Sequence, residues 1–237
     1  MSAAGLGGRR ISVIVPALNE AEGIMDAIED ARAGEDVEVI VVDGGSSDDT
    51  VSMVRKAGVR LIESPKGRGR QMNAGAAAAS GGTLLFLHAD TRLPRRFDRA
   101  VRRALRDPSV AAGAFSLRID APGIGLRLVE WGANRRSRTL GRPYGDQALF
   151  LSARIFHELG GYPEIPIMED YALIRRLSRY GRVVTLRQPV RTSARRWRRL
   201  GVLQTTLRNQ LIIAGYRLGV SPDTLARWYR MGGLQDR

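Results

Sequence analysis

Short apolar runs alternate with amphipathic segments through the first 93 residues of the chain. Four of these runs carry few charges and are rich in aliphatic side chains, at residues 11–15, 37–42, 59–62 and 83–87. Such runs are typical of strands that are buried on both faces of a parallel sheet. Helical spacing marks the intervening segments, at residues 21–32, 49–56 and 71–79. The alternation predicts a doubly wound α/β fold whose strands end at one shared crevice.

Beyond Pro94 the regular alternation stops. Apolar spacing predicts further helices at residues 95–105, 124–137 and 171–180. Strands are predicted at residues 110–117 and 182–186, at Val190, and in the apolar end of residues 145–151. The chain then ends in two helices, one over residues 200–220 and a shorter one that Ser221 caps and that reaches Arg230. The whole pattern indicates a mixed, mostly parallel sheet flanked by helices, with a C-terminal helical extension.

The first C-terminal helix carries a stripe of apolar residues, Leu203, Leu207, Leu211, Ala214 and Leu218. A stripe of this kind usually docks on the rest of the protein, and we expect that outcome here. The alternative is that the helix lies in a membrane interface beside a lipid acceptor. The periodicity alone leaves both arrangements open.

Composition excludes several classes of protein. The 237 residues are 43% hydrophobic, which is enough for a full core in one large domain or in two closely joined halves. The chain has no cysteine, so disulfides, thiolate metal sites and a cysteine nucleophile are excluded. No apolar run reaches the roughly 18 residues that cross a bilayer, and the start does not resemble a signal peptide. We therefore expect a cytoplasmic protein, soluble or attached to the inner face of the plasma membrane.

The formal net charge is +14, and only Lys56 and Lys66 of the basic residues are lysines. A basic surface favours phosphate-bearing ligands or an anionic membrane. Nucleic acid is not the expected partner, because aromatic residues make up only 6% of the chain and do not alternate with the basic ones.

Acidic residues follow two of the predicted strands. Asp43 ends the second strand, and His88, Ala89 and Asp90 come directly after the strand at residues 83–87. Carboxylates at this edge suit a hard divalent cation, which can in turn hold a diphosphate. Asp43 suits the N–H of a base or the hydroxyl of a ribose. The alternative for both aspartates is that they only cap the helices that follow.

Residues 64–75 form a glycine-rich basic segment with Lys66, Arg68 and Arg70. We expect a mobile loop that binds phosphate oxygens, which arginine does with two parallel hydrogen bonds. The segment lacks the Gly-Lys-Ser/Thr of a Walker loop and the spacing of a dinucleotide fingerprint. A solvated basic loop without a ligand is the alternative.

Four motifs, in this order, resemble those of the inverting family 2 glycosyltransferases with the glycosyltransferase-A fold. They are VIVPALNE at residues 13–20, VVDGGSSDDT at 41–50, GRGRQMNAG at 67–75 and LFLHADTRLP at 85–94. The combination of HADTRLP with GDQALFL at 145–151 and TSARRW at 192–197 is similar to a small bacterial subgroup associated with radical-enzyme and selenium-related genes.

The resemblance implies a Mn²⁺ or Mg²⁺ cofactor and a site for a nucleoside-diphosphate sugar. It implies that the donor nucleotide is bound by residues from the first four motifs: Pro16, Ala17, Asn19, Glu20, Asp43, Arg68, Arg70, Asn73 and Ala89. Asp90 would end the metal-binding DxD motif of the family, in which His88 replaces the first aspartate. A neutral imidazole binds these cations less favourably than a carboxylate, so His88 is either a ligand or a neighbour of the ligands.

The resemblance also implies the catalytic group. Asp170, in the ED pair with Glu169, would remove the proton from the acceptor hydroxyl. Acids at the start of a helix are also favoured by the helix dipole alone. Asp146, Gln147 and Glu169 are expected to bind hydroxyls of the donor sugar or acceptor, although the first two suit a simple turn as well. Arg195, Arg196 and Trp197 are expected to form a lid or diphosphate clamp; the alternative is a basic surface segment anchored by the tryptophan.

These expectations divide the chain into a flexible leader (1–10), a nucleotide-sugar-binding half (11–93), an acceptor-binding and catalytic half (94–198) and C-terminal amphipathic helices (199–237). The expected acceptor group is a hydroxyl, carboxylate or phosphate, and the sequence is also compatible with a lipid-linked acceptor. A homodimer is likewise compatible with the sequence. Two other functions compete: a nucleotidyltransferase, which normally has a glycine-rich signature and lysine where this chain has PALNE, and a basic module without catalysis that binds membranes or nucleic acid.

Overall fold

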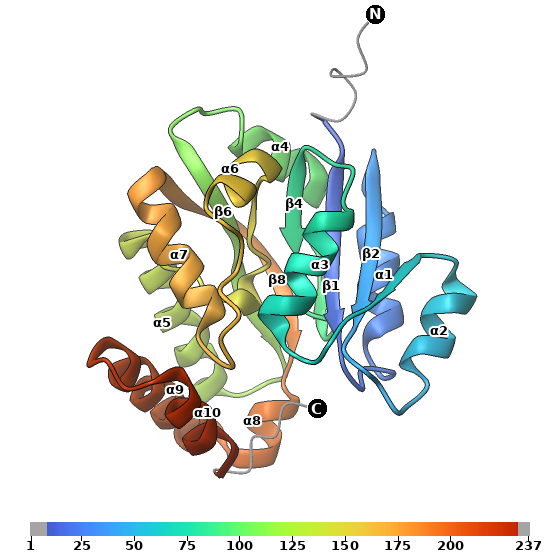
Figure 1. Cartoon of the computed structure of the whole chain (residues 1–237). Coiled ribbons are helices and arrows are strands. Elements are labelled where there is room, and N and C mark those ends of the chain that lie inside the picture. The colour runs from blue at the N-terminus through green and yellow to red at the C-terminus, as the bar shows by residue number, and fades with distance from the viewer. Residues whose placement is uncertain (1–8, 232–237) are drawn as a thin grey trace, which may run out of the picture.

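A single mixed sheet forms the centre of the protein (Figure 1). The computed structural model describes residues 9–231, so most of the predicted leader at residues 1–10 lies outside the described residues. The strands are β1 (Ile11–Ala17), β2 (Val37–Asp43), β3 (Arg60–Glu63), β4 (Thr83–Phe86), β5 (Thr91–Arg92), β6 (Val110–Asp120), β7 (Phe150–Ser152) and β8 (Arg182–Ser193). Their spatial order is β3-β2-β1-β4-β7-β6-β8-β5.

The sheet is mostly parallel, as predicted. Strands β1 to β4 pair in parallel with each other, and β6 pairs in parallel with β8. The pairs β4–β7, β6–β7 and β5–β8 are antiparallel. The carboxyl ends of β1, β2 and β4 consequently lie at one edge, and the segments that follow them meet there.

Helices cover both faces of the sheet (Figure 1). One face is packed by α1 (Ile24–Arg32), α2 (Thr50–Ala57) and α4 (Phe97–Ala104), whose apolar residues join one core cluster. The other face is packed by α3 (Arg68–Ala78), α6 (Ala153–Glu158) and α7 (Glu169–Tyr180), which form a second cluster. The remaining helices are α5 (Ile124–Leu140), α8 (Arg195–Leu200), α9 (Val202–Arg217) and α10 (Pro222–Met231), with a short 3₁₀ turn at Gly145–Gln147.

Three predicted boundaries were wrong for physical reasons. Strand β1 continues through Pro16, because its pairing with β2 extends to Ala17 opposite Asp43. Helix α3 begins at Arg68, so Arg68 and Arg70 stand on its first turn instead of in a mobile loop. The segments predicted as separate strands at residues 182–186 and 190 are one strand, β8, which bulges at residues 187–188 and continues past Pro189.

The leucine stripe of α9 does not dock on the domain. Leu203, Leu207, Leu211 and Leu218 are all exposed, and the helix buries Thr205, Ile212 and Gly215 instead. The outcome that we expected from periodicity is therefore wrong. Among the described helices, none combines the length and the apolar character that are needed to cross a membrane.

Gly75 allows α3 to pack unusually close to the sheet. A Cβ atom at this position would lie 2.4 Å from Ile14 Cγ2 and 3.0 Å from Val42 Cγ2. Both neighbours are fully buried and belong to β1 and β2, so they have no room to move aside. This close approach brings the first turns of α3 to the carboxyl edge of the sheet.

We predict that Gly75→Val lowers the free energy of unfolding by about 2 kcal/mol, because a branched side chain overpacks this contact. Urea unfolding followed by circular dichroism measures the change. Ala77→Val is the matched control, because it places the same side chain at an exposed position two residues along the helix. Equal stability of the two variants would contradict the close packing.

Candidate active site

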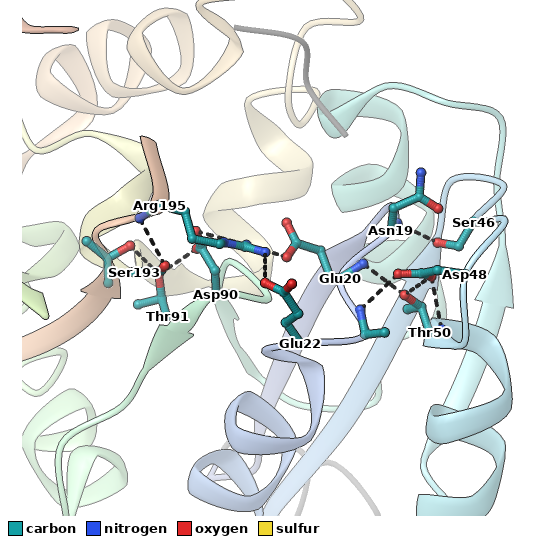
Figure 2. A network of polar contacts seen from close by, with 12 residues as sticks. Asn19, Glu20, Glu22, Ser46, Asp48, Thr50, Asp90, Thr91, Ser193 and Arg195 are labelled. Carbon is teal, nitrogen blue, oxygen red and sulfur yellow. Dashed lines mark hydrogen bonds and ion pairs between the residues drawn. The ribbon is translucent and has the colours of Figure 1, made fainter. Parts of the chain in front are cut away.

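Side chains fasten the loops after β1 and β2 to each other (Figure 2). Backbone N–H groups of the first loop donate to side-chain oxygens of the second in the pairs Asn19–Ser46 (2.9 Å), Glu20–Thr50 (2.8 Å) and Ala21–Asp48 (3.1 Å). In the opposite direction, the Ser47 N–H donates to Asn19 Oδ1 at 2.8 Å. Asn19 has a φ of 54°, a conformation in which asparagine is enriched. The two loops thus form one preorganised unit, which we call the loop floor (residues 18–23 and 44–50).

Asp43 shapes this loop floor. The side chain is 4% exposed and accepts hydrogen bonds from the N–H groups of Gly45 (2.8 Å) and Ser46 (3.0 Å) and from the Ser46 hydroxyl (2.5 Å). A carboxylate has about four acceptor sites, so little capacity remains for a ligand. The predicted contact with a base or ribose stays a prediction, and it would use the remaining site on Oδ1.

Gln71 was not among the predicted site residues, yet it holds the ends of β1 and β2 together. Its Nε2 donates to the carbonyl oxygens of Ala17 and Val42, both at 2.9 Å, from a position that is 3% exposed. Gln71 lies one turn before Gly75, whose small size lets the amide reach the strands. The signal in the sequence was a long polar residue in a helix otherwise rich in alanine and glycine.

Arg195 connects the loop floor to Asp90 (Figure 2). Its guanidinium nitrogens lie 2.5 Å from Glu20 Oε2, 3.5 Å from Glu22 Oε2 and 3.5 Å from Asp90 Oδ2. Helix α8 begins at Arg195, directly after the strand in which the Ser193 N–H donates to the Asp90 carbonyl at 3.0 Å. Burial raises the pKa of Glu20, and the hydrogen bond and charge of Arg195 only partly offset this effect. Arg195 therefore supplies the positive charge between these carboxylates.

Asp170 lies beside His88, next to Gly145. The Gly145 N–H donates to Asp170 Oδ2 at 2.7 Å, and the Tyr171 N–H donates to Oδ1 at 2.6 Å. A Cβ at Gly145 would lie 3.1 Å from His88 Nε2 and 3.2 Å from Asp170 Oδ2, so this glycine keeps the approach open. The charges of both Asp90 and Asp170 act on the His88 ring. Carboxylates that are far apart in sequence thus meet around one imidazole.

His88 is neutral at physiological pH. Burial, together with the positive charges of Arg68 and Arg196, lowers its pKa from 6.5 to about 4, although Asp90 and Asp170 act in the opposite direction. A neutral imidazole keeps one nitrogen lone pair. His88 can therefore accept a hydrogen bond or ligate a cation without first losing a proton.

Asp146 contains a buried oxygen that lacks a partner. Its Oδ1 makes no hydrogen bond within the described residues, and burial raises the pKa of the carboxyl group despite the nearby Arg136 and Arg196. Asp90 and Asp170 also act on this carboxyl, which places it in the same cluster. An unsatisfied buried oxygen is costly, so a hydroxyl or cation that reached it would be favoured.

The remaining predicted basic and amide groups divide between the site and the scaffold. Arg68 faces the cluster, with Nη1 3.9 Å from Glu169 Oε1, a carboxylate that is 6% exposed. Arg70 instead donates to Glu164 at 3.0 Å. Asn73 exchanges two hydrogen bonds, both 2.9 Å long, with the backbone of Tyr162. Arg70 and Asn73 thus hold the loop before α7.

Other predicted residues are enclosed by the protein. Gln147 is fully buried and donates to the Phe115 carbonyl at 2.9 Å, which argues against the predicted contact with a ligand hydroxyl. Trp197 packs in an apolar cluster with Leu117 and Leu126, so it anchors α8 and does not cover the site. Three predicted residues, Pro16, Ala17 and Ala89, are buried and can offer a ligand only their backbone.

The cluster fits a cation that has few protein ligands. In the described part of the chain, no three histidine or acidic side chains are arranged as a complete metal site. In phosphate-binding sites, Mg²⁺ commonly uses one or two carboxylates and takes its other ligands from phosphates and water. Asp90 and the neutral His88 suit this mode. The guanidinium of Arg195 lies 3.5 Å from Asp90 Oδ2 and offsets the negative charge that such a cation would otherwise neutralise.

The cluster lies outside two cavities of the described residues. A cavity of about 560 Å³ lies between Leu140, Tyr180 and Val183, and one of about 250 Å³ lies between Arg142, Tyr171 and Arg175. Neither contains Asp90 or His88.

Comparison with known proteins agrees with this arrangement. The profile described as "Glycosyl transferase family 2" matches residues 12–156, which include the loop floor, Asp90 and Asp146. The subgroup predicted from residues 88–94, 145–151 and 192–197 remains a prediction.

Curated relatives match over part of their length. The chain is 35% identical over 95 residues to glucosyl-3-phosphoglycerate synthase of Mycobacterium tuberculosis, a match of 35% of this chain and 29% of the relative. It is 40% identical over 102 residues to the succinoglycan biosynthesis protein ExoO of Rhizobium meliloti, or 40% of this chain and 29% of the relative. The matched part thus spans under a third of these relatives.

Solved structures share the fold. The mannosyltransferase PcManGT of Pyrobaculum calidifontis, in complex with GDP-Man and Mn²⁺, has a TM-score of 0.65 and 21% identity, covering 95% of this chain and 70% of its own. Glucosyl-3-phosphoglycerate synthase of M. tuberculosis, in complex with Mn²⁺, UDP and glucosyl-3-phosphoglycerate, has a TM-score of 0.59 and 23% identity, covering 80% and 75%. These similarities confirm the predicted glycosyltransferase-A fold.

We predict that His88 makes folding stability depend on pH. Between pH 6.5 and about 4 the unfolded chain binds a proton that the folded chain excludes, so the free energy of unfolding falls as pH drops through this window. The loss attributable to this group is at most about 3 kcal/mol. The His88→Asn variant should lack this contribution to the pH dependence of the free energy of unfolding. Urea unfolding in EDTA at several pH values measures the free energy of unfolding of both proteins.

The control is His157→Asn, which replaces the second of the chain's two histidines at an exposed position on α6. The His157 variant should keep the wild-type dependence on pH. Equal dependence in the two variants would show that His88 is not held neutral by its surroundings.

Proposed function

We propose that the chain, which belongs to glycosyl transferase family 2, transfers a sugar from a nucleoside-diphosphate sugar to an acceptor, with inversion at the anomeric carbon. The acceptor group is a hydroxyl, carboxylate or phosphate oxygen. The observation that carries the proposal is the meeting of Asp90, Asp146 and Asp170 around His88, next to a preorganised loop floor. Such a cluster offers both an anchor for the donor and a base for the acceptor.

The donor nucleotide would lie on the loop floor at the carboxyl ends of β1 and β2. Ligands of open α/β sheets bind at this edge. The hydrogen bonds between the two loops support this placement, because they hold the backbone rigid before a ligand arrives. Asp43 has capacity for one more donor, which suits a single contact with a base or ribose.

Asp90 and His88 would hold a Mn²⁺ or Mg²⁺ ion. When bound, that ion neutralises the charge of the nucleoside diphosphate as it leaves. The neutral state of His88 supports its role as a ligand or hydrogen-bond acceptor there. The complexes of PcManGT with Mn²⁺ and of the M. tuberculosis synthase with Mn²⁺ or Mg²⁺ support the choice of ion.

Asp170 would act as the catalytic base. It takes the proton of the acceptor hydroxyl while the acceptor oxygen bonds to the anomeric carbon and the bond from that carbon to the diphosphate breaks. The N–H groups of Gly145 and Tyr171 hold the two carboxylate oxygens in place, and each oxygen keeps a lone pair for the proton. One base is sufficient, because the leaving diphosphate needs charge neutralisation and not a proton.

Four further side chains would orient the sugar and the diphosphate. The unpartnered Oδ1 of Asp146 suits a hydroxyl of the donor sugar or acceptor, and Glu169 lies beside Arg68 at the same place. Arg195 and Arg196, on the short helix α8, would turn from the carboxylates to the diphosphate and so cover the site. The present ion pairs of Arg195 with Glu20 and Asp90 support this exchange, since a bound cation would compete for both carboxylates.

We predict different losses for Asp170→Asn and Asp90→Asn. Asp170→Asn should lower kcat about 10²- to 10⁴-fold and leave binding of the donor intact, because it removes only the base. Asp90→Asn should also abolish the stabilisation by nucleoside diphosphate that depends on Mn²⁺. Turnover of UDP-, GDP- and dTDP-sugars with Mn²⁺ gives the rates. For the wild type, a ligand at a hundred times its Kd should add about 2.7 kcal/mol of stability in a thermal-shift assay.

Asp107→Asn is the control, because Asp107 is an exposed carboxylate before β6, apart from the cluster. Full turnover by Asp170→Asn would rule out the assigned base. If no nucleoside-diphosphate sugar is turned over or stabilises the wild type, sugar transfer by this chain is itself refuted.

A further inference from the structure

The outward face of α9 is an uninterrupted apolar stripe. Leu203, Leu207, Leu211 and Leu218 follow each other at helical spacing and are 73%, 55%, 66% and 86% exposed. Trp228, on the adjoining helix α10, is 52% exposed, and its ring lies 3.8 Å from the Cβ position of Gly215 on α9. We call the four leucines the leucine face. Together with Trp228 they are half of the large hydrophobic side chains that are exposed in residues 9–231.

The exposure of the leucine face does not result from poor packing of α9. On its opposite side, α9 buries Thr205, Ile212 and Gly215, and Ile212 joins an apolar cluster with Met168 and Leu225. Helix α9 is therefore fixed to the domain in one orientation. Exposure of leucine at this density costs free energy in water, so a covering surface is expected.

The helices that surround the leucine face are strongly basic. Residues 195–231, which form α8, α9 and α10, contain eight arginines and a single acidic residue, Asp223. Arg198 and Arg199 are exposed on α8, and Arg227 is exposed on α10 next to Trp228. The covering surface must therefore accept leucine side chains and supply negative charge.

We propose that the leucine face docks on an anionic lipid bilayer. A helix that lies in the interface buries its leucines at the acyl boundary, while the exposed arginines of the neighbouring helices meet lipid phosphates. A second copy of this chain is a poorer occupant, because pairing two leucine faces would bring two sets of arginines together. Attachment rather than insertion follows, since no described helix is long and apolar enough to span.

Docking through this face would place the acceptor side of the candidate site close to the bilayer. The α9–α10 pair packs on the start of α7: Tyr171 packs edge to face against Tyr216 with ring centroids 5.6 Å apart and accepts a hydrogen bond from Arg217 at 3.0 Å. Tyr171 directly follows Asp170. If the proposed sugar transfer holds, on which this step alone rests, the acceptor is a lipid-linked oxygen presented at the membrane surface.

Vesicle binding tests the docking without any assay of sugar transfer. The full chain should sediment with vesicles of phosphatidylglycerol and phosphatidylcholine, and much less with phosphatidylcholine alone or at high salt. Leu207→Ser/Leu211→Ser should lower the partition coefficient by about tenfold or more, because two apolar anchors are lost. Leu140→Ser, at the far end of α5 and 60% exposed in the wild type, is the matched control and should bind normally.

The absence of native cysteine allows a direct second measurement. A polarity-sensitive fluorophore on Leu207→Cys should shift to the blue with anionic vesicles, whereas one on Ser52→Cys, an exposed position on α2, should not. Two results would overturn the proposal. One is equal vesicle binding by the wild type and the double serine variant. The other is a wild-type dimer in light scattering that the double serine variant loses, which would make a second copy the occupant.

Discussion

The candidate site depends on balancing carboxylates with guanidinium groups. Glu20, Asp90, Asp146 and Asp170 converge on one place, and two unit charges about 4 Å apart repel each other by about 4 kcal/mol at the effective dielectric of a protein surface. Arg195, between Glu20 and Asp90, offsets part of this repulsion, and the charges of Arg68 and Arg196 offset more. Without these positive groups the strand ends could not hold acids so close together.

This balance also explains which parts of the site can move. Asp90 follows a buried strand, and Asp170 is held by two backbone N–H groups, so both carboxylates are fixed. Arg195 starts α8, a helix of six residues whose Trp197 and Leu200 pack in apolar clusters. A divalent cation with a diphosphate would replace Arg195 as the source of positive charge and release it toward the phosphates. The same electrostatic requirement would thus apply whether Arg195 or a bound cation supplies the positive charge.

The sequence predicted the elements better than the roles of individual side chains. The placement of helices and strands follows from apolar periodicity, which is why the α/β architecture could be anticipated. The expected meeting of Asp90 with Asp170 came from the resemblance to the family 2 glycosyltransferases. Roles depend on which neighbours satisfy each polar group, and periodicity does not contain that information. Gln71 and Gln147 are both buried amides that bind backbone carbonyls; the first was overlooked and the second was expected to face a ligand. Asp43 was expected to bind a ligand, yet most of its acceptor capacity serves its own loop.

The orientation of α9 could not be predicted from apolar periodicity either. Periodicity identifies which residues share a face of a helix, but the direction of that face depends on which side packs better. Gly215 and Thr205 are small enough for close packing, and Leu225 approaches to 2.8 Å of the Cβ position of Gly215. The flatter, small-residue side therefore turned inward and the leucines turned outward. An apolar stripe that does not pack inward is available to bind a surface outside the protein. The arginines around the leucines of α9 favour a negatively charged surface.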